Sequence, residues 1–201
     1  MKLFYARGAC SLATRILLNE MGIPADYEAV NLKTKKTETG RDYLTLNPKG
    51  VVPALQLENG VVLTENAVIM QYLADHYQAI NLLPALDDFN RYRVLEWVNF
   101  ITTDLHKGFS PLFNSQVPEP LKQQIFIPLL MAKFNYVDRC LHHHDYLCGK
   151  HFTLPDIYLV VILRWARVLK LDMSGLPHLQ AYQTALETRQ SIVDALQQEG
   201  L

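Results

Sequence analysis

Cys10 stands where two segments of different character meet, within the stretch YARGACSLATRILL that covers residues 5–18. The residues before it resemble a strand, and those after it resemble an amphipathic helix. A helix N-terminus carries unpaired N–H groups and a partial positive charge, which stabilise a thiolate. The pattern fits a working thiol at Cys10, and it equally fits a small residue beside a capping Ser11.

A proline opens the strand-like stretch GVVPAL at residues 50–55. Proline cannot donate to a strand ladder, and cis peptide bonds occur almost entirely before proline. A cis bond between Val52 and Pro53 would turn the valine backbone outward, leaving its N–H and C=O free for a peptide-like ligand. The alternative is an ordinary proline in an edge strand.

Two further motifs lie at expected helix starts. In TENA, Glu65 and Asn66 would begin a helix whose N–H groups suit a carboxylate, although Thr64 as a plain N-cap explains the motif as well. In FTLPD, Thr153 and Asp156 have the spacing of a capping box. We interpret this second motif as a folding device, so Asp156 is a poor catalytic candidate.

The remaining cysteines and histidines do not form a recognisable site. Cys140 and Cys148 bring the total to three, without a CxxC pair, so neither a disulfide framework nor a zinc ribbon is expected. Consecutive helical residues point about 100° apart, so His142, His143 and His144 cannot converge on one ion. We expect a solvated helix end there and no metal site.

The spacing of apolar residues predicts two domains. The first half alternates between strand and helix and ends in a hairpin around Asn59 and Gly60, which is the thioredoxin-like order. From about residue 88 only helical patterns remain, with an expected kink or break at Pro128. The expected fold class is an α/β thioredoxin-like domain at 1–80, a linker at 81–87 and an all-α domain at 88–201. The elements expected are strands at 2–5 and 26–31, a hairpin within 52–65, and helices at 11–22, 64–77, 91–113, 119–143, 154–171, 177–186 and 189–199.

Composition narrows the function classes. The 201 residues carry a formal net charge of −1 and are 49% hydrophobic, as in an ordinary globular protein. No basic block indicates nucleic acid, and no apolar run approaches the ~20 residues of a membrane helix. The start of the chain does not resemble a signal peptide, so we expect a cytoplasmic protein.

Four stretches of the chain resemble the bacterial beta-class glutathione S-transferases. They are MKLFYARGACSLATRILL, NPKGVVPALQLENGVVLTENAVIMQYLAD, EWVNFITTDLHKGFSPLF and LCGKHFTLPDIYLVVILRWA. A cysteine at position 10 separates this class from relatives that carry tyrosine or serine. The resemblance implies the glutathione S-transferase fold, a homodimer, and glutathione as co-substrate with no permanently bound cofactor.

The resemblance also implies a glutathione site. Cys10 and His106 would be the catalytic residues near the sulfur, and Cys10 would be able to form a mixed disulfide with glutathione. The Val52 backbone, before a cis bond to Pro53, would pair with the cysteinyl part. The other implied contacts are Lys35 with the glycyl carboxylate, Glu65 and Asn66 with the γ-glutamyl end, and Asn99, Thr103 and Asp104 in the same region, Asp104 reaching the partner subunit's ligand.

Helical spacing supports part of this assignment independently. At about 100° per residue, Asn99, Thr103 and His106 fall on one stripe. Asp104 lies roughly 140° from Asn99 on the same geometry, which suits a residue that points to another partner. Without the resemblance, a solvated polar face explains the stripe. The opposite side is apolar and consists of Val94, Val98, Ile101 and Leu105.

The predicted reaction is attack of the glutathione thiolate on a small hydrophobic electrophile, which serves detoxification. The resemblance places the electrophile between the domains, against side chains such as Phe109, Phe113 and Trp165. An alternative is monothiol disulfide exchange, in which Cys10 attacks a disulfide and glutathione resolves the product. A third hypothesis is a non-catalytic binding protein on the same fold.

Overall fold

The computed structural model describes residues 1–201, which pack as two compact units. Unit 1 consists of Met1–Ile80 and Glu187–Leu201, and unit 2 consists of Asn81–Leu186. The sequence grouped 88–201 as one helical domain, whereas the last part of that range packs within unit 1.

A five-stranded mixed sheet forms the framework of unit 1, in the order β3-β2-β1-β4-β5. The central strand β1 (Lys2–Tyr5) pairs in parallel with β2 (Asp26–Asn31) and antiparallel with β4 (Ala54–Gln56). The expected early strands are confirmed. The edge strand β3 (Lys36–Thr37) was not predicted, because it has only two residues within a polar loop.

The predicted hairpin is also confirmed. β4 pairs antiparallel with β5 (Val62–Thr64), and the turn between them is closed by a hydrogen bond from Gly60 N–H to the Leu57 carbonyl at 2.9 Å. Gly60 has φ +84°, a left-handed conformation that glycine adopts without steric cost. The Asn-Gly pair therefore specifies the turn locally.

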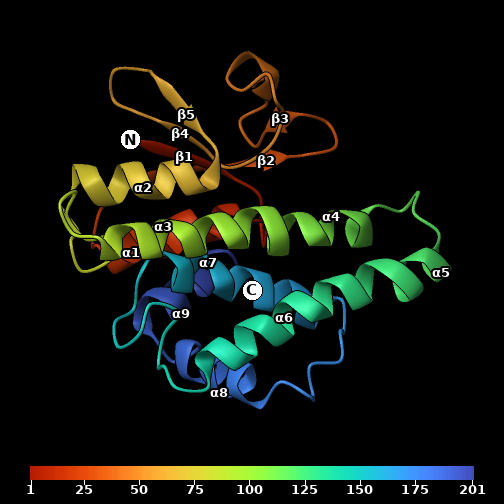
Figure 1. Cartoon of the computed structure of the whole chain (residues 1–201). Helices are drawn as coiled ribbons and strands as arrows, with labels where there is room; N and C mark the ends of the chain where they lie inside the picture. The colour runs from red at the N-terminus through yellow and green to blue at the C-terminus, as the bar shows by residue number, and fades with distance from the viewer. The chain divides into compact units, whose positions relative to one another are not determined.

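Helices α1 (Ser11–Glu20) and α2 (Asn66–His76) lie on one side of this sheet (Figure 1). A third helix, α9 (Gln190–Gln198), packs against α1. It buries Ile192 and Ala195 completely. The apolar stripe of α9 predicts an amphipathic helix, but such a stripe does not identify the surface that covers it. This is why the sequence assigned α9 to the wrong packing unit.

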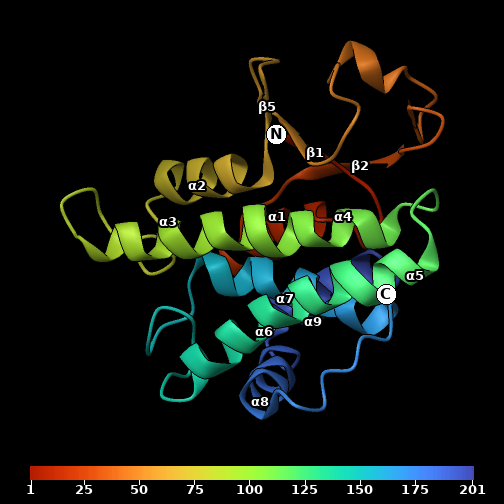
Figure 2. The same ribbon diagram turned by 45° about the vertical axis from the view of Figure 1, so that its right-hand side comes forward.

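Unit 2 contains two long helical rods, each with a π-helical turn inside it (Figure 2). The first runs through α3 (Asn90–Phe100), the π segment Ile101–His106 and α4 (Lys107–Phe113). The second runs through α5 (Glu119–Leu121), the π segment Lys122–Phe126 and α6 (Ile127–Leu141).

Pro128 lies in the first turn of α6, directly after the second π segment. Because the rod is helical before Pro128 as well, the proline removes one N–H from the hydrogen-bond ladder and crowds the carbonyl of the preceding turn. The expected irregularity is therefore confirmed, as a local change of helical type in a rod that continues.

The helix α7 (Leu154–Val168) is the buried centre of unit 2 and packs against α3 and α8 (Pro177–Leu186). Its start has the predicted capping box, in which Thr153 N–H donates to Asp156 Oδ2 at 2.8 Å. The buried helix thus begins at the residue that the motif FTLPD specified.

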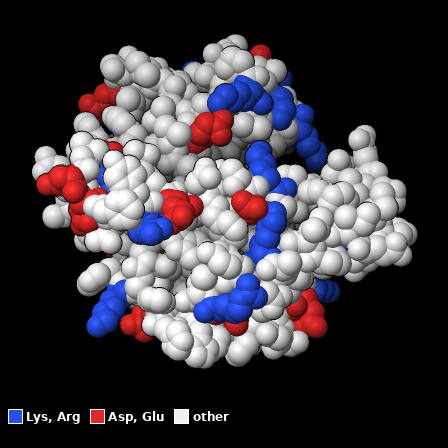
Figure 3. All heavy atoms as spheres, in the orientation of Figure 1, with Lys and Arg blue, Asp and Glu red and all other residues white.

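The surface carries charges of both signs. On the face drawn in Figure 3, lysines and arginines occur beside acidic residues, and neither sign covers the face. None of the helices has both the length and the apolar character required to span a membrane.

Candidate functional site

Cys10 is the N-cap residue of α1 and is buried, with 9% of its surface exposed. Its thiol Sγ lies 3.2 Å from the Val52 carbonyl oxygen, to which it donates a hydrogen bond. The alternative in which Ser11 caps the helix is not what the structure shows. Ser11 is the first helical residue, fully buried, and its hydroxyl bonds both the N–H and the C=O of Ala6.

The Val52-Pro53 peptide bond is cis, as expected. The preceding carbonyl, that of Val51, accepts hydrogen bonds from the Tyr43 hydroxyl and the Asn47 side chain, each at 2.8 Å. The expectation that the Val52 carbonyl is free needs correction, because it accepts the Cys10 thiol. The thiol and the expected peptide-binding backbone are thus direct neighbours.

Lys35 reaches the same loop from the segment after β2. Its ammonium Nζ donates to the Gly50 carbonyl at 2.7 Å. Gly50 has φ +62°, and a Cβ there would lie 3.1 Å from Leu44 and 3.3 Å from Lys35. Glycine is therefore required for the close approach that brings the Lys35 charge to the Gly50 carbonyl, two residues before Val52.

Glu65 precedes α2 with φ +72° and ψ 111°, a conformation that non-glycine residues rarely adopt. Such outliers gather at functional sites, where they aim groups at a ligand. The Glu65 carboxylate pairs with Lys49 Nζ at 2.6 Å, and more than half of each side chain is exposed. Thr64, expected as the cap, instead accepts from Lys49 at 3.0 Å, and Glu65 is the N-cap residue.

The Asn66 side chain faces α1 rather than the solvent. Only 6% of the residue is exposed, and its Oδ1 accepts from the Thr14 hydroxyl at 2.7 Å. Its amide Nδ2 is buried without a hydrogen-bond partner. Asn66 thus ties the N-terminus of α2 to α1, and it retains one unused donor.

Within unit 2, the His106 ring is enclosed by aromatic side chains. Its Nδ1 lies 2.7 Å from the Tyr158 hydroxyl, and its ring centroid lies 4.8 Å from that of Trp165. Burial, together with the nearby charge of Lys107, lowers the pKa of His106 to about 4. The imidazole is therefore neutral near pH 7.

Of the other three expected residues of unit 2, Asn99 lies just before the first π segment, and Thr103 and Asp104 lie within it. Asn99 and Thr103 are exposed, and the Thr103 hydroxyl donates to the Asn99 carbonyl and to Asp104 Oδ2, each at 3.0 Å. Asp104 also pairs with Lys133 Nζ at 3.2 Å. The four apolar residues expected on the opposite side are all buried, namely Val94, Val98, Ile101 and Leu105.

The argument that placed Asn99, Thr103 and His106 on one regular stripe is wrong in one respect. Residues Ile101–His106 form a π-helical turn, whose i→i+5 pattern holds more residues per turn than an α-helix. The spacing of about 100° therefore does not hold across it. His106 turns inward against Tyr158, while Asn99 and Thr103 stay exposed.

The aromatic residues expected beside an electrophile differ in exposure. Phe109 is fully buried and cannot contact a ligand, which corrects the expectation for that residue. Phe113 is 51% exposed and packs edge-on against the half-buried Trp165, with centroids 5.4 Å apart.

Several residues that shape these sites escaped the sequence analysis. Thr14 bonds the Asn66 side chain, and Tyr43 and Asn47 bond the Val51 carbonyl. Lys49 pairs with Glu65, and Tyr158 bonds the His106 ring. Asn47 and Lys49 carried a signal, because both lie within three residues before the GVVPAL motif.

Two family models match the chain. Residues 8–76 match the glutathione S-transferase N-terminal domain, and residues 100–190 match the glutathione S-transferase C-terminal domain.

Relatives match over the whole length. The glutathione S-transferase GstA of Escherichia coli O157:H7 is 45% identical, and the alignment covers 100% of both chains. Among solved structures, the ternary complex of BphK, a bacterial GST, has 43% identity and a TM-score of 0.96, with complete coverage of both chains. A sphingomonad glutathione S-transferase complexed with glutathione has 40% identity and a TM-score of 0.95, again with complete coverage.

Proposed function

The chain belongs to the glutathione S-transferase family, and we propose that it is a beta-class member whose unit 1 binds glutathione around Cys10, Val52 and Glu65. Its reaction is transfer of the glutathione thiolate to small electrophilic compounds. One observation carries the proposal about the site. The Cys10 thiol lies 3.2 Å from the carbonyl of the cis-linked Val52, so the thiol adjoins a backbone segment suited to a peptide.

The proposed roles in unit 1 follow the charges of glutathione. The α-amino group of the γ-glutamyl end meets the Glu65 carboxylate, and its carboxylate meets the N–H groups of the first α2 turn, starting at Asn66. The Val52 backbone, fixed before Pro53, pairs with the cysteinyl part. Lys35 meets the glycyl carboxylate.

The transfer step needs a glutathione thiolate near neutral pH. The N-terminus of α1 supplies a favourable field, because the positive end of the helix dipole lies there. The family resemblance assigns His106 to the sulfur, and its imidazole is neutral near pH 7. The assignments of Asn99, Thr103 and Asp104 to the same ligand rest on the family resemblance.

Disulfide exchange is a second candidate activity. Cys10 is the only cysteine of unit 1, which suits a monothiol route. Its thiolate would attack the glutathione sulfur of a mixed disulfide, form a Cys10–glutathione disulfide and release the substrate thiolate. A second glutathione thiolate would then attack that disulfide, yield oxidised glutathione and restore the Cys10 thiolate.

Glutathione binding tests the proposed site. By titration calorimetry, parent protein should bind glutathione saturably, and Glu65→Ala should weaken binding by more than about 1 kcal/mol because it removes a charged hydrogen-bond partner. Glu58→Ala is the matched control, since Glu58 is a highly exposed carboxylate of the hairpin turn in the same unit. Equal affinities for the Glu65 and Glu58 variants would move the γ-glutamyl site elsewhere.

We also propose a cytoplasmic homodimer that acts in detoxification. The large apolar side chains exposed on α3 and α6, such as Tyr92, Leu129 and Tyr136, are suited to a second copy. Light scattering at micromolar concentration should give about twice the chain mass of 23.0 kDa. A monomer mass would contradict the dimer. Unchanged glutathione binding in Asp104→Ala would reject a ligand shared between subunits.

A further inference from the structure

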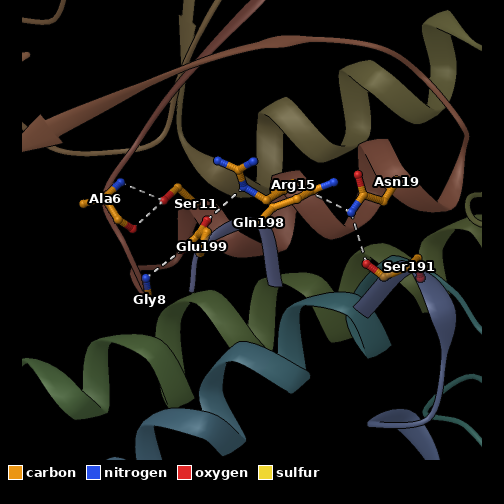
Figure 4. A network of polar contacts seen from close by, with 8 residues as sticks. All are labelled: Ala6, Gly8, Ser11, Arg15, Asn19, Ser191, Gln198 and Glu199. Carbon is orange, nitrogen blue, oxygen red and sulfur yellow. Dashed lines mark hydrogen bonds and ion pairs between the residues drawn. The ribbon is translucent and has the colours of Figure 1, made fainter. Parts of the chain in front are cut away.

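A buried ion pair links the last residues of the sequence to α1. Arg15 Nε donates to Glu199 Oε1 at 3.1 Å, and the two side chains are 4% and 0% exposed (Figure 4). The Arg15 guanidinium also lies over the rings of Tyr5 and Tyr27, at 4.4 and 3.7 Å from their centroids. Such a pair is held in place by its packing, and neither partner can leave without uncovering a buried charge.

The same carboxylate also holds the loop that carries Cys10. Glu199 Oε2 accepts the Gly8 backbone N–H at 2.8 Å, while Oε1 faces Arg15 (Figure 4). Gly8 precedes Cys10 by two residues and has φ +68°, so the chain reverses there. One buried side chain thus fixes positions on both sides of the Cys10 thiol.

Two neighbours of Glu199 strengthen this attachment. The Arg7 guanidinium donates to the Gly200 carbonyl, and the Leu201 side chain covers Gly8, where a Cβ would lie 3.7 Å from it. The loop Arg7–Gly8 is therefore held by residues that follow it by more than 190 positions in the chain.

We propose that Glu199 is a positioning residue for Cys10, because it fixes the turn that sets the thiol against the Val52 carbonyl. The inference rests on the proposed function, in which Cys10 reacts with disulfides at that place. Disulfide exchange needs the Cys10 sulfur to approach a disulfide sulfur of a ligand that is bound to the Val52 backbone. A displacement of about 1 Å at such a site lowers a rate by up to about a hundredfold. Alkylation by a small reagent such as iodoacetamide needs no bound ligand, so its rate does not depend on this alignment.

The test compares two reactions of the same thiol. The rate at which oxidised glutathione modifies Cys10 is divided by the rate of its alkylation by iodoacetamide, both followed at Cys10 by mass spectrometry. Glu199→Asp keeps the charge that faces Arg15, but its side chain is one methylene shorter and cannot reach both Arg15 and Gly8. We expect the ratio to fall about tenfold. Arg7→Ala, at the exposed surface, should lower it by a smaller factor and gives a second test should Glu199→Asp not fold.

Asn19→Ala is the matched control. Asn19 also joins α1 to the C-terminal segment, because its side-chain amide donates to the Ser191 carbonyl and to Gln198 (Figure 4). It lies more than two helical turns beyond Ser11, the first residue of α1. It should leave the ratio unchanged even where it lowers the melting temperature. An unchanged ratio in both Glu199→Asp and Arg7→Ala, or an equal fall in Asn19→Ala, would overturn the inference. A parent protein whose Cys10 is not modified by oxidised glutathione would instead reject the proposed exchange function.

Discussion

Asp156→Ala should lower the free energy of unfolding by about 3–5 kcal/mol. Asp156 is fully buried and accepts hydrogen bonds from Thr153 N–H at 2.8 Å, Leu147 N–H at 2.9 Å and the Tyr182 hydroxyl at 2.6 Å. Alanine would leave these donors in the interior without their acceptor and would remove the capping box of the central helix α7. The side chain also joins that helix to the preceding loop and to α8, so three segments lose a common partner.

Urea unfolding followed by tryptophan fluorescence measures this effect, because Trp97 and Trp165 both lie in unit 2. Asp172→Ala is the control, since this exposed aspartate also accepts a backbone N–H, that of Ser174 at 3.0 Å. It should hardly move the midpoint, because water replaces a lost partner at the surface. If Asp156→Ala shifted the midpoint no more than Asp172→Ala, the capping network would be unimportant to stability.

Cys10→Ala should abolish disulfide exchange, with a loss of at least about a hundredfold, while transfer to an electrophile falls by a smaller factor. The difference arises because Cys10 supplies the attacking sulfur only in exchange, whereas glutathione supplies it in transfer. Ser11 does not substitute for the thiol, because it is fully buried and bonded to Ala6. The two activities are measured side by side, with a glutathione mixed disulfide and with a halogenated aromatic compound.

Oxidised glutathione provides a direct readout of the same prediction. It should add one tripeptide to the parent protein, at Cys10, and none to Cys10→Ala. The thiol of Cys148 is a built-in control, because burial raises its pKa to about 11 and keeps it protonated near pH 7. If Cys10 reacted no faster than Cys140 and Cys148, and its alanine variant kept both activities, Cys10 would only fill the corner between β1 and α1.

Much of the candidate site was predictable because its signals are local. The cis bond depends on one dipeptide, Val52-Pro53, and the hairpin depends on Asn59 and Gly60. The position of Cys10 at a helix start follows from the change of hydrophobic period around it. The predictions that were wrong concern geometry that a short sequence pattern does not determine. The π turn at Ile101–His106 displaced the expected stripe, and tertiary packing buried Phe109 and turned Asn66 toward Thr14.

The sequence by itself determined the element order, the thioredoxin-like alternation, the all-helical remainder and the motifs of the site, since each is set by residues within one or two turns of one another. Only the tertiary structure decided which surfaces meet. It packed α9 on α1, placed Glu199 on Gly8 and paired Lys49 with Glu65. The reason is physical: an apolar stripe or a charge specifies that a partner is needed, and packing between distant segments specifies which one.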